Sequence, residues 1–82
     1  MIETGTFYQL KRGLSGIRLD GPRSEQGVAA SLPGGAIVFV AGHSAFFQML
    51  EVRWGNDIFA VFEEDLGDRG EQVQSGFSTI SA

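Results

Sequence analysis

The sequence predicts an all-β fold in a single small domain. Its 82 residues include 12 glycines and only 2 prolines, and glycine at this density marks many turns. The stretches between the glycines are short, rich in β-branched and aromatic residues, and often alternate between apolar and polar positions, as strands do. No heptad pattern or internal repeat is present. Together these features favour many short strands over helices.

The first half of the chain is expected to hold short strands separated by turns. Each alternating stretch places apolar residues at every second position, which suits a strand with one buried face. These stretches are residues 6–10, residues 17–19, and residues 28–32, the last being a short strand or the extended edge of a loop. The expected turns are residues 13–16, the polar loop 20–27 and Pro33-Gly34-Gly35. The apolar run AIVFV, residues 36–40, follows and predicts a strand buried on both faces or nearly so.

A β-hairpin is predicted around Gly55-Asn56-Asp57, with strands over residues 49–54 and 58–62. A loop of two or four residues gathers five large apolar residues on one face, namely Leu50, Val52, Trp54, Phe59 and Val61. A three-residue loop would place charged residues of the first strand on that face instead. Because a slip of one residue moves every side chain to the other face, the pattern selects the even-length turn. Trp54 is therefore expected in the core.

After Phe62 the alternation stops and an acidic stretch begins. Residues 63–67 suit a single helical or 3₁₀ turn, with Leu66 as its inward anchor and Gly67 as its end. A last short strand is expected over residues 71–74. The carboxylates of this part of the chain are Glu63, Glu64, Asp65, Asp68 and Glu71. They lack the alternating spacing and bidentate glutamate of a calcium loop, so we interpret them as a solvated acidic turn.

The Pro33-Gly34-Gly35 turn before an apolar strand, and Phe62 followed by Asp65-Leu66, resemble SH3-like small β-barrel proteins of bacteria. The order of the expected elements is similar as well. The resemblance covers residues 6–74 and implies a barrel of about five short strands with one helical or 3₁₀ turn near residues 63–67. It implies residues 1–74 as the barrel domain and residues 75–82 as a C-terminal tail, flexible or docked. The resemblance is structural and implies no particular activity.

Charge and composition argue against several classes of function. A net charge of −4 with six scattered basic residues is unlike a nucleic-acid-binding footprint, and it also argues against an anionic membrane surface. With no cysteine and one histidine, His43, neither disulfides nor a thiolate metal site can form, and no metal or cofactor is expected. No apolar run approaches the ~18 residues of a membrane span, and no signal peptide is visible. We expect a soluble cytoplasmic protein.

No catalytic constellation is recognisable in the sequence. Gly42-His43-Ser44 lacks the Gly-x-Ser-x-Gly spacing and the following helix of a nucleophile elbow. We therefore expect a small non-catalytic interaction or accessory module. The alternative is an oligomeric enzyme or ligand-binding protein whose site forms across a symmetry axis, from polar groups such as Gln9, Gln48 and Gln74. A third hypothesis, from charge and size, is an acidic mimic that occupies a nucleic-acid-binding or toxin partner.

Seven phenylalanines in so short a chain suggest more apolar surface than one core hides. Adjacent Phe46 and Phe47 point to opposite faces if they lie in a strand, so one faces the core and the other faces out. The surplus is either extra core under the loops or a patch that contacts a partner or a second copy. The expected self-association surface is Phe46, Phe47, Phe77 and Ile80, and the expected assembly is a symmetric dimer.

Overall fold

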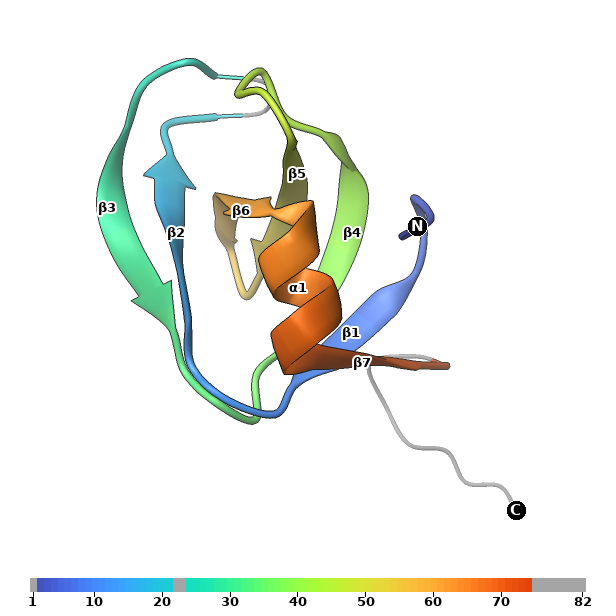
Figure 1. The fold of residues 1–82 in the computed structure, drawn as a ribbon. Coiled ribbons are helices and arrows are strands. Elements are labelled where there is room, and N and C mark those ends of the chain that lie inside the picture. The colour runs from blue at the N-terminus through green and yellow to red at the C-terminus, as the bar shows by residue number, and fades with distance from the viewer. Residues whose placement is uncertain (1, 22–23, 75–82) are drawn as a thin grey trace.

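The computed structural model describes residues 2–21 and 24–74 of the chain. Within these residues seven strands form one antiparallel sheet, and a single short helix lies against it (Figure 1). The elements are β1 (Phe7–Leu10), β2 (Leu14–Leu19), β3 (Gly27–Leu32), β4 (Ile37–His43), β5 (Met49–Trp54), β6 (Asp57–Phe62), α1 (Glu63–Arg69) and β7 (Gly70–Val73). The order across the sheet is β3-β2-β6-β5-β4-β1-β7. The all-β prediction is confirmed.

The sheet has seven strands, one at each stretch expected from the sequence pattern, whereas the resemblance to SH3-like barrels implied about five. Residues 13–16 were predicted as a turn, which is wrong, since β2 begins at Leu14 and runs through Gly16. Gly16 serves a close approach of two strands rather than a turn. A Cβ built on Gly16 would lie 2.7 Å from the carbonyl oxygen of Ala60 on β6.

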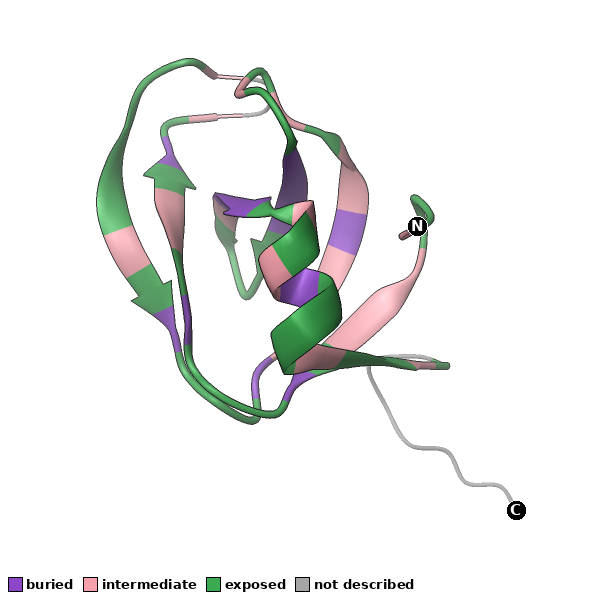
Figure 2. Cartoon of the chain, in the orientation of Figure 1, coloured by how far each residue is buried: buried purple, intermediate pink, exposed green. Residues whose placement is uncertain are grey.

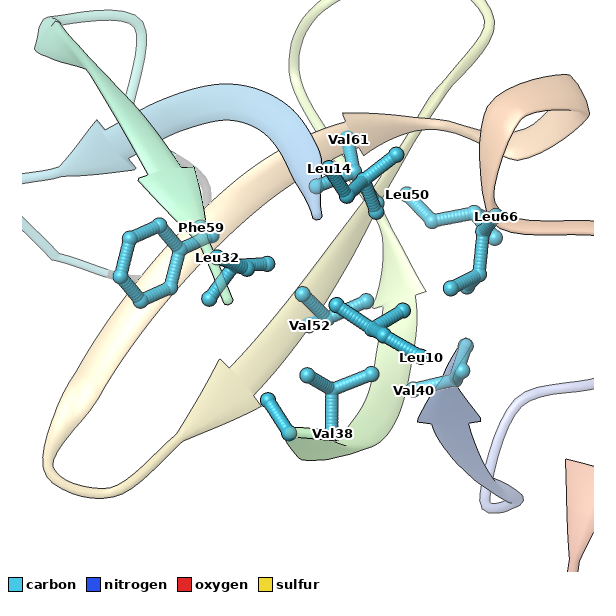
Figure 3. Close-up of a cluster of buried hydrophobic side chains, with 11 residues drawn as sticks. Leu10, Leu14, Leu32, Val38, Val40, Leu50, Val52, Phe59, Val61 and Leu66 are labelled. Carbon is cyan, nitrogen blue, oxygen red and sulfur yellow. The ribbon is translucent and has the colours of Figure 1, made fainter. Parts of the chain in front are cut away.

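The β5–β6 hairpin has the predicted register. Trp54 pairs with Asp57, so the loop is the two-residue turn Gly55-Asn56, and Gly55 adopts the left-handed conformation with φ 63°. The core that results is drawn in Figure 3 and consists of Leu10, Leu14, Leu32, Ala36, Val38, Val40, Leu50, Val52, Phe59, Val61 and Leu66. Trp54 was predicted in this core and is instead 36% exposed. It is the last residue before the turn, beyond the edge of the core, and its ring reaches back to Phe59 with centroids 6.3 Å apart.

β4 is fully buried on one face and partly buried on the other, so the prediction of burial on both faces or nearly so holds fully for one face only. Val38 and Val40 are fully buried, whereas Ile37 and Phe39 are half-buried. Phe39 covers the second face together with Phe7, its partner on β1, and the two ring centroids lie 5.0 Å apart. An aromatic pair on the outer face of the sheet thus takes the place of a second core layer.

α1 carries the predicted anchor but is longer than predicted. Leu66 is fully buried. The helix does not end at Gly67 but continues to Arg69 and is closed by Gly70, whose backbone N–H donates to the Leu66 carbonyl. Arg69 also donates from Nη1 to the Gly13 carbonyl oxygen at 3.3 Å, which ties the end of the helix to the start of β2. The last strand, expected over residues 71–74, is β7 and pairs with β1.

Candidate binding surface

The loop before β5 closes as a four-residue turn. The Phe46 carbonyl accepts a hydrogen bond from the Met49 N–H at 3.2 Å, which makes Phe47 and Gln48 the two corner residues. Gln48 adopts φ 63°, and it is the one non-glycine residue of the described chain with a positive φ. A positive φ at the third turn position normally calls for glycine, so glutamine is held here in a strained conformation.

This turn sends its two phenylalanines in different directions. Phe46 is half-buried and packs on a second apolar cluster formed by Leu19, Met49 and Ala60. Phe47, at the corner, is 84% exposed. One phenylalanine inside and one outside was the prediction, but the cause is the turn geometry rather than the alternation of a strand. Phe46 therefore supplies extra core, and Phe47 supplies exposed apolar surface, whose contact with a partner or a second copy stays a prediction.

Three segments that are distant in the sequence meet where β6 becomes α1. The Glu63 N–H donates to the Gln48 carbonyl at 3.2 Å, which joins the start of the helix to the turn before β5. The Ile2 N–H donates to Glu63 Oε2 at 3.0 Å, which brings in the N-terminal segment. Between them lies a pocket of about 420 Å³, here called the Phe62 pocket, lined by Ile2, Gln48, Phe62, Glu63, Glu64 and Gly67.

The Phe62 pocket combines an apolar wall with an acidic rim. Val61 takes the inward position on β6 and is fully buried, so the next residue, Phe62, is turned outward and is 47% exposed. Glu64 is exposed and Glu63 is half-buried, and both stand in the first turn of α1. Gly67 adds no side chain, and the pocket therefore stays open between the helix and Ile2. A cationic group with an apolar body suits such a lining.

Among the described residues, the others considered from the sequence as candidate site residues do not line the Phe62 pocket. His43 is exposed at the end of β4, and the Ser44 hydroxyl accepts a hydrogen bond from the Phe46 N–H at 3.1 Å, so it serves the loop. No group of three or more metal-ligating side chains lies together within the described residues. In the same part of the chain no helix is both long and apolar enough to cross a membrane. Phe77 and Ile80 lie outside the described residues.

Of the three glutamines of the symmetric-site hypothesis, only Gln48 is among the residues that line the Phe62 pocket. Gln9 lies on β1 and Gln74 follows β7, the partner strand of β1. Glu51 is only 5% exposed, and its burial was not predicted from the sequence. Arg53 Nη2 lies 3.9 Å from Glu51 Oε2. The opposite charges at positions 51 and 53 were the only signal of this contact in the sequence.

Comparison of the chain with known protein families, with curated proteins and with solved structures finds no match in any of the three. The function must therefore be inferred from the surface itself.

Proposed function

We propose that this chain is a small non-catalytic interaction module with an SH3-like barrel, and that the Phe62 pocket binds a basic segment of a partner protein. The β4-β5-β6 meander, the helix that follows it and the final strand beside β1 support the barrel assignment. We place the binding surface of the module at the junction of β6 and α1, where the Phe62 pocket lies.

The observation that carries the proposal is the exposure of two aromatic side chains at this junction. Phe47 is 84% exposed and Phe62 is 47% exposed, and Gln48, the neighbour of Phe47, lines the same pocket as Phe62. Single exposed apolar residues are normal on protein surfaces. Two large ones beside a pocket of about 420 Å³ are typical of a recognition site, because burying them on a partner removes apolar area from water.

The acidic rim defines the chemistry of the partner. Glu63 and Glu64 border the pocket, and the whole chain carries a net charge of −4. An arginine side chain can place its guanidinium over the Phe62 ring and pair with the exposed Glu64 carboxylate. The negative charge of the molecule also steers a basic segment toward this face and repels an acidic one.

The strained turn supports the same site. Gln48 in a left-handed conformation costs on the order of 1 kcal/mol relative to glycine. Such strain persists where the surrounding structure holds the residue in place, and strained residues cluster at functional sites. Gln48 is one of the residues that line the Phe62 pocket. Its amide can donate to a carbonyl of a bound peptide backbone while the guanidinium pairs with the rim.

The test is a titration followed by amide chemical shifts. The probe is a short acetylated peptide with one arginine between two leucines, and its matched control carries citrulline, which is neutral and nearly isosteric, in place of the arginine. We expect the arginine peptide to shift the amides of Gln48 and residues 62–67, and the citrulline peptide to bind at least tenfold more weakly.

Two charge-matched variants locate the site. Glu64→Gln removes a rim carboxylate, whereas Glu71→Gln removes an equal charge on β7, away from the Phe62 pocket. The first should weaken the arginine peptide several-fold, and the second should leave its affinity within a factor of two. Equal effects of both variants, or shifts spread over the whole sheet, would mean that the peptide responds only to net charge, and the proposed site would be wrong.

A further inference from the structure

Within residues 2–21 and 24–74, no strand pairs with the outer side of β3, which forms one edge of the sheet. β3 lies at the end of the strand order and pairs with β2 alone, through six consecutive residue pairs without a register shift. Most of β3 is exposed, as Figure 2 shows, and Val28 is 54% exposed. The backbone N–H and C=O groups on the outer side of an edge strand are available for pairing with another strand.

The open edge lacks the features by which proteins usually block such pairing. Edge strands are commonly short, charged, interrupted by proline or bent by a bulge. The opposite edge, β7, follows this rule, because it has four residues and carries an ion pair of 3.4 Å between Glu71 and Lys11. β3, with the sequence GVAASL, has six residues and neither charge nor proline. It is therefore a template for a further strand.

The charges at the two ends of β3 indicate which strand fits. Glu25, exposed, lies two residues before the strand begins. At the other end, the chain leaving β3 passes Arg12, since a Cβ built on Gly34 would lie 3.4 Å from the Arg12 Cα. In an antiparallel pair of two β3 strands, the acidic end of one copy lies beside the basic end of the other. Such an arrangement is complementary to itself about a two-fold axis.

We propose that β3 pairs antiparallel with β3 of a second copy of this chain, so that the two sheets become continuous. The side chains that alternate along β3 fit this contact. Ala30 and Leu32 face the core of their own copy, whereas Ala29 and Ser31 are small, exposed and uncharged. Two such strands approach to the usual spacing of about 4.8 Å without a clash or like-charge repulsion along the strand.

The dimer is expected to be weak and dependent on concentration. A strand of six residues is about 20 Å long, and pairing along this edge alone buries less than the roughly 1,000 Å² typical of stable interfaces. This inference is independent of the proposed peptide binding, because β3 and the Phe62 pocket share no residue.

Sedimentation equilibrium over a wide concentration range tests the proposal. We expect the intact chain to dimerise, and the double variant Ala29→Lys/Ser31→Lys to raise the dissociation constant at least tenfold, because lysines on an edge strand repel their symmetry mates. Ser15→Lys is the matched control. Ser15 is the β2 partner of Ser31 on the same face but one strand inside the edge, and this variant should leave the dissociation constant within a factor of three.

A charge reversal provides a second test of the dimer if the double lysine variant of β3 does not fold. Glu25→Arg should weaken the dimer several-fold, and adding Arg12→Glu in the same chain should restore it. Hydrogen exchange supplies a direct readout, since alternate β3 amides should become protected as the protein concentration rises. Three results would each overturn the proposal: a monomer at millimolar concentration, a dimer that survives in a folded edge variant, or a charge reversal that Arg12→Glu does not rescue.

Discussion

Replacing Leu66 with alanine should cost the protein a large part of its stability. Leu66 is fully buried and is the only buried residue of α1, so the helix is held to the core through this side chain. Leucine-to-alanine changes at such sites destabilise by about 2–5 kcal/mol, because the lost methyl groups leave a cavity. For 82 residues the total stability is about 4–12 kcal/mol. A loss of about 3 kcal/mol would lower the Tm by about 12–24 °C.

Thermal and urea unfolding followed by circular dichroism measures this loss. Asp68→Ala is the matched control, because Asp68 is an exposed residue of the same helix and its replacement should change stability by about 0.5 kcal/mol or less. Leu66→Met keeps the apolar volume and should cost less than about 1.5 kcal/mol. A decrease in Tm of less than about 4 °C for Leu66→Ala would refute the argument, since it would mean that α1 contributes little to the core.

Further predictions concern single residues outside the helix. Gly16→Ala should destabilise by about 1–3 kcal/mol in urea unfolding, because its Cβ would press on a strand backbone, whereas Gly21→Ala, with open space around it, should be nearly neutral. Trp54 fluorescence should be quenched readily by acrylamide in the folded protein, and quenching as slow as that of a core indole would contradict its 36% exposure. Lys11→Ala should change the unfolding free energy by less than about 1 kcal/mol, since its ion pair with Glu71 is exposed on both sides.

The parts of the fold that follow from local patterns were predictable from the sequence. The β5–β6 register could be derived because a slip of one residue would have turned Leu50 and Val52 away from the core. Leu66 could be identified because it is the one large apolar residue in an acidic turn. In both cases the deciding signal is a local pattern of apolar and polar residues in the sequence.

The parts that depend on distant segments were not predictable. Gly16 looked like a turn residue because nothing near it in the sequence reveals that the β6 backbone passes at that point. By strand alternation Trp54 lies on the core-facing side of β5, but the core does not extend to the end of the hairpin. The Phe62 pocket depends on a hydrogen bond between Ile2 and Glu63, which are 61 residues apart. No periodicity in the sequence contains such information.

The two proposed surfaces together determine how the module would engage a partner. One Phe62 pocket of about 420 Å³ holds a single side chain and part of a backbone, so one basic segment should bind weakly. Pairing through β3 leaves both pockets uncovered, because the edge strand and the Phe62 pocket share no residue. A partner with two basic segments would then gain from the high effective concentration of the second pocket, provided that its linker spans the dimer. The edge variant Ala29→Lys/Ser31→Lys should therefore weaken a two-segment peptide strongly and leave a one-segment peptide unchanged. The affinities of the one-segment and two-segment peptides for the intact chain should be compared at dimerising concentration, across a series of linker lengths. If the two affinities are equal at every length, the two surfaces do not act together, and the expected gain from the second pocket is wrong.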